Sequence, residues 1–335
     1  MKRRTFLRHV VLSGPAAAIG WPGIACADKP KWVNPSVTAG QPSSRVVIAH
    51  RSDLRTSSGA ISEQSCSRLL DTAVENLFSA SASDIWSTLF SPRDVVGLKV
   101  NCLAGRGLST CPELVEAVVE RLLRAGLSPE RIIIWDRFDR DLERGGYRLF
   151  QGRGKPQCFA TDRVGYTPEI YEYGSVGSQL SRVLSDLCTA VINLPVLKDH
   201  GIVGVSVALK NFFGAINNPH KYHEGVGDPY VADLNMLDQI RNKTRLTICD
   251  ASAPQYQGGP PYMPEWTWTM DSLIAATDMV AMDRVGWQII ARKRAEVGLP
   301  TLAAEGREPT YIATAADPAH RLGAFDDSLI EIVSC

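Results

Sequence analysis

Three of the six histidines of this chain lie within residues 193–223, where they are candidates for chemistry. Two of them form His220-x-x-His223 among Asn, Pro and Gly residues, which favours a loop or a helix end. Imidazoles three residues apart can bind one metal ion if the backbone turns there. The spacing therefore predicts that His220 and His223 bind a metal ion of unknown identity, and His200 is a further candidate ligand in the same segment. The alternative is that these histidines are simply solvated at the surface.

The same segment contains a lysine in apolar company. Lys210 follows Val205, Val207, Ala208 and Leu209 and precedes two phenylalanines. An ammonium group without water around it is destabilised, so such a lysine can serve as a nucleophile or as a covalent anchor for a cofactor. The alternatives are that its side chain reaches water or pairs with a carboxylate.

Other polar residues follow apolar stretches that we expect to be strands. Lys99 and Asn101 come at the end of one such stretch, and Lys198 lies just beyond another. Asp250 ends a third stretch and is a candidate base or ligand, or alternatively a turn cap. Asp278 precedes a helical pattern and is predicted to cap that helix.

The pattern of the chain from residue 45 onward predicts an α/β fold, with a mostly parallel sheet flanked by helices. Apolar strands alternate with segments of helical periodicity. We expect two lobes, at about 45–190 and 191–335, with a cleft between them. Ligands of such sheets bind at the carboxyl ends of strands, so the loops after Val100, Trp135, Leu194 and Asp250 should line the cleft. The expected strands are 45–49, 95–100, 131–135, 189–194, 245–250 and 329–333. The expected helices are 62–80, 110–124, 177–187, 205–213, 230–242 and 277–297.

The first 27 residues are typical of an export signal. A basic start that includes Arg3-Arg4-x-Phe6-Leu7-Arg8 precedes an apolar stretch over 10–24 and a small-x-small site ending at Ala27. The paired arginines indicate the twin-arginine export machinery as a partner. The alternatives are an ordinary secretory signal or a membrane anchor. We therefore expect cleavage near Ala27, a linker over 28–44, and a periplasmic or exported protein without a stable membrane span.

Composition excludes several classes of protein. The chain has 36 Lys and Arg against 36 Asp and Glu, and loss of residues 1–27 removes four basic residues and no acidic ones. The remaining net charge of −4 does not suit a nucleic-acid-binding protein. Seven cysteines remain after that cleavage, with no Cys-x-x-Cys spacing. This disfavours zinc ribbons and iron–sulfur clusters.

Several motifs in one order resemble the bacterial family called domain of unknown function 362. They are Val96-Gly-Leu-Lys-Val-Asn101, Ile192-Asn-Leu-Pro-Val-Leu-Lys-Asp-His200, Ala208-Leu-Lys-Asn-Phe-Phe-Gly214, the 250–260 loop and Ala275-Ala-Thr-Asp-Met-Val-Ala-Met-Asp283. The resemblance covers the whole mature chain and implies an α/β fold. Some members of that family carry ferredoxin-type clusters, but this chain lacks the cysteine runs that such clusters need.

A shorter motif, His200-x3-Gly204-x-Ser206-x3-Lys210, is similar to one of the nickel-pincer lactate racemases. This similarity implies that His200 transfers a proton, that Lys210 anchors a pincer cofactor, and that His220 or His223 binds the metal, with nickel or iron as candidate ions. The racemases bring a second acid/base histidine from another strand end. This chain has Asp136 in the comparable stretch, so racemisation would require that carboxyl group to replace an imidazole.

These observations predict an exported enzyme, an isomerase or an oxidoreductase, that uses a metal or cofactor on a small anionic molecule such as a hydroxy acid. His200, Lys210 and Asp250 are its candidate catalytic residues. The candidate cofactor-binding residues are Lys99, Asn101, Lys198, Lys210 and Asn211. The alternative function is a periplasmic protein that binds a metal or ligand without catalysis.

Overall fold

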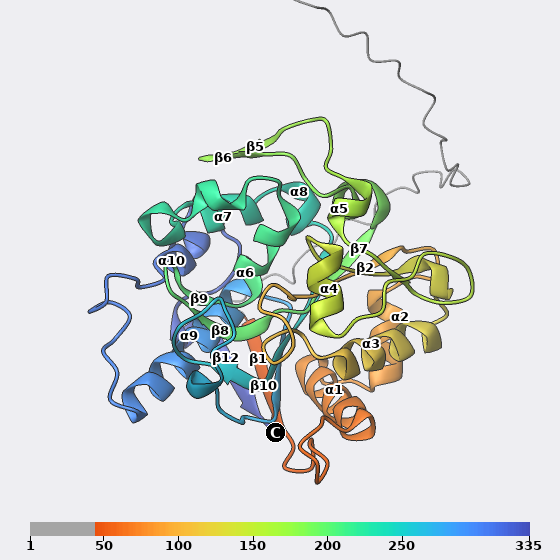
Figure 1. The fold of residues 1–335 in the computed structure, drawn as a ribbon, viewed down its shortest axis with the longest axis horizontal. Coiled ribbons are helices and arrows are strands. Elements are labelled where there is room, and N and C mark those ends of the chain that lie inside the picture. The colour runs from red at the N-terminus through yellow and green to blue at the C-terminus, as the bar shows by residue number, and fades with distance from the viewer. Residues whose placement is uncertain (1–43) are drawn as a thin grey trace, which may run out of the picture. The chain divides into compact units, whose positions relative to one another are not determined.

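The computed structural model describes residues 44–335. The predicted signal peptide at 1–27 and nearly all of the predicted linker at 28–44 lie outside these residues. Within the described part, a mixed, mostly parallel sheet is flanked by helices, which confirms the predicted α/β class (Figure 1). No helix in this part of the chain combines the length and apolar character needed to cross a membrane.

The main sheet places strands from both halves of the chain side by side. Its order is β12-β1-β11-β10-β7-β2-β3-β4, and β8 and β9 are attached through β10. Neighbours among β10, β7, β2, β3 and β4 are parallel, whereas β11 is antiparallel to both β1 and β10. The strands of this sheet are β1 Ser44–His50, β2 Val96–Lys99, β3 Ile132–Trp135, β4 Gln157–Cys158, β7 Ala190–Asn193, β8 Val196–His200, β9 Gly204–Ser206, β10 Thr244–Gln255, β11 Ser272–Ala276 and β12 Ile330–Ser334. A separate hairpin pairs β5 Tyr171–Tyr173 with β6 Val176–Ser178.

Two apolar cores cover the two faces of the sheet. Successive strand residues point to opposite faces, so Val46 and Ile133 belong to one core while Val47 and Ile132 belong to the other. Helices α1, α2 and α3 pack on one face, and α6, α7, α9 and α10 pack on the opposite face (Figure 1). The α-helices are α1 Glu63–Phe78, α2 Ala82–Leu89, α3 Pro112–Arg124, α4 Asp139–Gly145, α5 Thr161–Val164, α6 Ala208–Asn211, α7 Tyr230–Asn235, α8 Asp238–Arg241, α9 Met279–Glu296 and α10 Tyr311–Ala316. The 3-10 turns are Pro129–Arg131, Phe212–Ala215, Pro219–Tyr222, Glu224–Gly227, Pro264–Trp266 and Asp327–Leu329, and Val183–Leu187 forms a π-helix.

Local capping explains where the two longest helices begin. The side chain of Ser62 accepts a hydrogen bond from the backbone N–H of Ser65 and so starts α1. Asp278 accepts from the N–H groups of Val280 and Ala281, which confirms its predicted role as the cap of α9. The helix predicted over 110–124 begins at Pro112, and the Thr110 hydroxyl donates a hydrogen bond to the carbonyl oxygen of Leu194.

Several predicted helices are wrong or too long. The stretch 205–213 begins in the short strand β9, which pairs with β8, and becomes helical only from Ala208, in the single turn α6 and the 3-10 turn that follows it. The stretch 177–187 begins in β6 and ends in a π-helix, and 230–242 divides into α7 and α8. Short apolar runs satisfy helix and strand spacing equally well, so periodicity alone does not decide between them. The two predicted lobes contribute strands to one sheet, and the cleft between them stays a prediction.

Candidate functional site

The carboxyl ends of three neighbouring parallel strands bring the first site residues together. Lys99 ends β2, and Asp136 follows directly after β3. The Lys99 Nζ donates to the Asp136 Oδ1 at 2.8 Å, to the Asn211 Oδ1 at 3.3 Å and to the backbone oxygen of Val100 at 2.6 Å. These contacts use all three N–H groups of the ammonium. Lys99 is therefore a buried and fully satisfied charge that holds two strand ends and α6 together.

A relay of hydrogen-bonded side-chain amides extends from the Lys99–Asp136 pair toward Lys198. Asn193, the last residue of β7, accepts a hydrogen bond from the Asn211 Nδ2 at 2.8 Å. The Asn101 Nδ2 donates to the Asn211 Oδ1 at 3.0 Å, and the Asn101 Oδ1 accepts from the Lys198 Nζ at 2.7 Å. The amide groups fix the position of the Lys198 ammonium without neutralising its charge.

The hairpin of β8 and β9 presents Lys198 and His200 together. The two residues are separated by one position on β8, so they lie on the same face of the hairpin. His200 pairs with Gly204 across the hairpin, where Gly204 has a φ of +82° and a Cβ atom would meet the backbone oxygen of Arg307 at 2.3 Å. Glycine is thus required at this turn for conformation and for space.

Lys210 contacts a histidine and an aromatic ring. Its Nζ lies 3.1 Å from the His223 Nε2 and 3.5 Å from the centroid of the Phe213 ring. The Nδ1 of His223 lies 2.9 Å from the backbone oxygen of Pro219, to which it can only donate. The neutral His223 ring therefore accepts a hydrogen bond from Lys210. Burial lowers the pKa of Lys210 well below its ordinary value of 10.5, and the charge of Lys198 lowers it further.

His200 lies beside His223, with a distance of 5.4 Å between the ring centroids. Its Nδ1 accepts from the backbone N–H groups of Ile202 at 3.3 Å and Val203 at 3.4 Å. Burial, followed by the charge of Lys210, lowers the pKa of His200 to about 2. The neutral ring consequently carries its proton on Nε2 and presents an N–H donor. The pKa of His223 is lowered to about 4, chiefly by burial and then by Lys210.

We call Lys198, His200, Lys210 and His223 the basic cluster. Within the described residues, no carboxylate forms an ion pair with any of its members. Burial lowers the pKa of Lys198 to about 8, although the more distant Asp136 opposes this change. The cluster therefore combines N–H donors and positive charge in a dry environment, which favours an anionic or oxygen-rich ligand.

An ionic network that the sequence did not reveal supports the basic cluster. The Arg307 Nη1 binds the Asp199 carboxylate and also donates to the backbone oxygen of His200 at 3.3 Å. The N–H of Gly259 donates to the Asp199 Oδ2 at 3.1 Å, and the N–H of Gly201 donates to the Gly259 backbone oxygen at 2.8 Å. Arg307 thus fixes the backbone next to the His200 ring from more than 100 residues away, a separation that leaves no local signal.

The remaining predicted site residues lie apart from the basic cluster. His220 is exposed, whereas His200 and His223 lie side by side. Over residues 44–335, no group of three or more His, Cys, Asp or Glu side chains is placed to hold a metal ion. The carboxylate of Asp250 accepts from the N–H groups of Cys111 and Ser252, at 2.8 and 2.9 Å. Its contact with the N–H of Ser252, two residues further on, is that of a local turn, and its role as a base or ligand stays a prediction.

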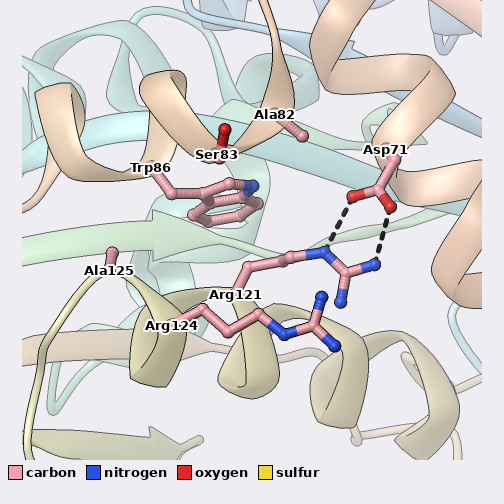
Figure 2. Close-up of a pocket in the computed structure, with 7 residues that line it drawn as sticks. All are labelled: Asp71, Ala82, Ser83, Trp86, Arg121, Arg124 and Ala125. Carbon is pink, nitrogen blue, oxygen red and sulfur yellow. Dashed lines mark hydrogen bonds and ion pairs between the residues drawn. The ribbon is translucent and has the colours of Figure 1, made fainter.

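Two surface pockets lie elsewhere and contain no member of the basic cluster. One is about 140 Å³ in volume and lies among α1, α2 and α3, where Asp71 and Arg121 form an ion pair beside Trp86 (Figure 2). The other, of about 340 Å³, lies beside α9 and is lined by Arg284 and Trp287. The Arg121 guanidinium is paired with Asp71 and Glu120. Its positive charge is therefore largely neutralised, and the first pocket should attract an anion less strongly than the basic cluster does.

The family model described as Domain of unknown function (DUF362) matches residues 96–288, which is more than half of the chain. A crystal structure of a Thermotoga maritima protein from the Northeast Structural Genomics Consortium is similar at a TM-score of 0.38 and 11% identity. That similarity covers 71% of this chain and 59% of the other, so this chain spans less than two thirds of that protein. No curated protein matches the chain. The whole basic cluster lies inside the region matched by the family model, whereas Arg307 lies beyond it.

Proposed function

Since this chain belongs to the DUF362 family, whose members share a domain of unassigned function, we propose that its basic cluster binds a small anionic molecule of the hydroxy-acid type. The observation that supports this proposal is the buried set of Lys198, His200 and Lys210 without a paired carboxylate. A bound carboxylate would supply the missing negative charge and accept from the ammonium and imidazole N–H groups. It would also offset the desolvation of the two lysines.

Each residue has a distinct part in this proposal. The Lys198 ammonium, oriented by Asn101, attracts the carboxylate. The Nε2–H of the neutral His200 ring donates to an oxygen of the ligand, in the manner of an electrophilic imidazole. Lys210, with its lowered pKa, has an amine that can act as a nucleophile or as an anchor. His223 accepts its hydrogen bond and is the nearest group that could take up a proton from it.

A covalently held cofactor on Lys210 is part of the enzyme proposal, following the motif similarity to the nickel-pincer racemases. The buried amine beside two imidazoles has a donor set that fits an anchored group and a metal that nitrogen ligands suit, such as nickel or iron. The described residues alone do not form a three-ligand metal site, so a metal here would need further ligands from the organic group. When bound, such a group would accept hydride from the hydroxyl-bearing carbon of the substrate.

The position of Asp136 argues against racemisation by two opposed acid/base groups. Its Oδ1 accepts from Lys99 and from the N–H of Arg137, and its Oδ2 accepts from the N–H of Cys102. These hydrogen bonds hold the carboxylate in place as an acceptor, so it is poorly placed to replace a catalytic imidazole. Among the two reactions named, this arrangement favours an oxidoreductase over a racemase.

Export through the twin-arginine machinery completes the proposal, because that route accepts proteins that have already folded. We propose that the mature protein acts in the periplasm or outside the cell. The test is fractionation of cells that express the full chain, with lysine replacing Arg3 and Arg4 in the matched control. Cytoplasmic retention of the wild-type chain would contradict export and leave the proposal for the basic cluster intact.

The binding proposal is tested by calorimetric titration with L-lactate, D-lactate and sulfate. We expect saturable binding of at least one hydroxy acid, loss of that binding in Lys198→Met, and no change in the control Lys221→Met, whose lysine is exposed. Affinity should fall as pH rises through about 8, because Lys198 then loses its proton. Binding that is unchanged in Lys198→Met, or absent for all three probes, would refute the proposal.

Catalysis and simple binding are separated by further measurements on the exported protein. Added mass on the peptide that contains Lys210, together with bound nickel or iron, supports the cofactor-dependent enzyme. With such a protein, His200→Ala should abolish turnover of the hydroxy acid. An unmodified Lys210, no metal and retained affinity for the anion would support the alternative, a binding protein without catalysis.

A further inference from the structure

His320 lies outside the basic cluster and is held between two carboxylates. Its Nε2 lies 2.9 Å from the Asp233 Oδ1, and its Nδ1 lies 2.8 Å from the Asp317 Oδ1. Asp233 belongs to α7, whereas Asp317 and His320 follow α10. His320 is 7% exposed and Asp233 is 4% exposed, so the contact between them is largely shielded from water. The ring therefore joins α7 to the segment after α10.

The two contacts determine the protonation state of the ring. An ionised carboxylate accepts hydrogen bonds and cannot donate them, so each contact needs an N–H group on the imidazole. A neutral histidine has one such group, whereas an imidazolium has two. Burial by itself lowers the pKa of His320, but the hydrogen bonds with Asp233 and Asp317 outweigh burial and raise the pKa above its ordinary value of 6.5. His320 is therefore an imidazolium at slightly acidic pH, with two charge-assisted hydrogen bonds.

Neither carboxylate can turn away from the ring without losing other hydrogen bonds. The Asp233 Oδ2 accepts from the backbone N–H of Ser175 at 2.8 Å and from the hydroxyl group of the same residue at 2.6 Å. The Asp317 Oδ1 accepts from the backbone N–H groups of Ala319 and His320, at 2.8 and 2.9 Å. Loss of one proton from the ring would place a nitrogen lone pair against one of these fixed oxygens, which is repulsive. The ring would then have to leave that contact.

The same contacts also hold the β5–β6 hairpin. Residues 174–175 form the turn between its two strands. A Cβ atom at Gly174 would lie 2.5 Å from the Asp233 Oδ1, so this turn packs directly on the carboxylate. The hydroxyl group of Tyr173 donates to the backbone oxygen of Ala319 at 3.4 Å. The hairpin, α7 and the segment after α10 thus meet at the imidazolium.

We propose that His320 is a pH-dependent clamp, which joins the β5–β6 hairpin, α7 and the segment after α10 while its ring carries two protons and releases them when one proton is lost. The clamp holds an element that supports the basic cluster. The Asn235 Nδ2 of α7 donates to the backbone oxygen of Leu209 at 3.1 Å, and Leu209 lies in α6 beside Lys210. The proposal itself needs neither a ligand nor export.

The groups around the ring set the direction of the pH dependence. Among the described residues, the titratable groups that face it are Asp233 of α7, Asp317 of its own segment and Tyr173 of β5, whose ring centroid lies 6.1 Å away. Arg321 is exposed and donates to a backbone oxygen of the same turn instead. Because the pKa of His320 is raised by folding, the stabilisation is fully present below 6.5 and is lost as pH rises through the raised pKa. The hydrogen bond with His320 lowers the pKa of Asp317, so that contact also weakens at strongly acidic pH.

The first test is an NMR titration of the purified protein with isotope-labelled histidine, in which the His320 ring is assigned through its backbone. We expect both ring nitrogens to carry protons at about pH 6 and the ring to titrate above 6.5. Asp317→Asn, which removes charge from a partly exposed side chain, should bring the pKa of the ring closer to 6.5. The control His50→Gln, which alters an exposed histidine of β1, should leave that pKa unchanged. A ring nitrogen without a proton at about pH 6, or titration at or below 6.5, would overturn the proposal.

The second test is hydrogen exchange of the Ser175 N–H, corrected for the intrinsic pH dependence of exchange. Its opening constant should rise by about tenfold for each unit by which the pKa of His320 exceeds 6.5, as pH is raised from about 6 to about 9. His50→Gln should show the same rise, whereas His320→Gln, which has no titratable ring at this position, should not. A constant value in the wild type would overturn the proposal even if His320→Gln fails to fold, and so would an equal rise in His320→Gln. Neither test uses a hydroxy acid or cell fractionation, so failure here leaves the binding and export proposals intact.

Discussion

Replacement of Lys198 by methionine should stabilise the protein at neutral pH. In the folded state the lysine is 1% exposed and its pKa is lowered from 10.5 to about 8, mainly by burial. A lowering of about 2.5 pH units corresponds to about 3 kcal/mol at about 1.4 kcal/mol per unit. Methionine removes this cost and still fills the space of a long, flexible side chain. It also removes the hydrogen bond to the Asn101 Oδ1, a loss of about 1 kcal/mol. The net expectation is a gain of about 2 kcal/mol at pH 7.

The sign of this effect follows from proton binding by the folded and unfolded states. Between about pH 8 and 10.5 the unfolded chain keeps a proton on Lys198 that the folded protein has lost. The contribution of Lys198 to the free energy of unfolding therefore rises with pH across this window. Below pH 8 both states are protonated and the full cost is present. Above 10.5 both states are neutral and the cost vanishes.

Urea denaturation of the wild type, Lys198→Met and Lys221→Met from pH 6 to 10 measures this difference. The Lys198→Met protein should exceed the wild type most below pH 8, and the advantage should shrink toward pH 10. The exposed Lys221 should give a difference near zero at every pH. A loss of stability in Lys198→Met that is the same at all pH values would show that burial of the Lys198 ammonium carries no net free-energy cost. That result would remove the physical basis of the anion proposal.

Three further substitutions test the architecture by urea or thermal denaturation. Asp136→Asn should reduce the free energy of unfolding by about 3–5 kcal/mol, because it leaves the buried charge of Lys99 without its partner; a loss below 1 kcal/mol would contradict the pairing. Asp278→Ala should cost about 1–2 kcal/mol through loss of the cap of α9, and an unchanged urea midpoint would exclude that role. Gly259→Ala should lower the Tm sharply or prevent soluble expression, since its Cβ would lie 1.9 Å from the backbone oxygen of Asp199; a normal Tm would show that the loop can move.

Six of the ten strands of the main sheet in the described residues could be predicted because their signal is local, whereas β4, β8, β9 and β11 were missed. Ile132 to Trp135 is a short apolar run followed directly by Asp136, and Ala190 to Ile192 is one followed by Asn193. Such runs are typical of buried parallel strands. Once such strands are parallel, their carboxyl ends meet, so the proximity of Lys99 and Asn101 to the 193–223 segment follows from topology. The helix predicted over 62–80 was equally predictable from its apolar spacing, and it is α1, Glu63–Phe78.

The parts that sequence reasoning missed depend on contacts across long separations. The residues around Val205 fit a helix as well as a strand, and only pairing of Asp199 with Val205 and of Lys198 with Ser206 across the hairpin makes Gly204 to Ser206 a strand. The orientation of the His200 ring depends on the N–H groups of the turn that follows it. Because hydrogen-bond direction is set by folded geometry, the sequence could suggest a histidine in the site but could not say whether it donates or accepts.

The energetic disadvantage of the basic cluster is the strongest argument that it serves a ligand. A fold built only for stability would give Lys198 and Lys210 carboxylate partners, as it does for Lys99 with Asp136, or would replace them with apolar residues. Instead, an amide relay, a hairpin and the Asp199–Arg307 network hold two amines that have no carboxylate partner, and a neutral imidazole, in place. Local violations of stability rules concentrate at functional sites. An anion that pairs with these amines would offset the cost of their burial, and this offset would contribute to the free energy of binding. Replacement of Lys198 should therefore raise the stability of the protein without the anion and lower its affinity for the anion.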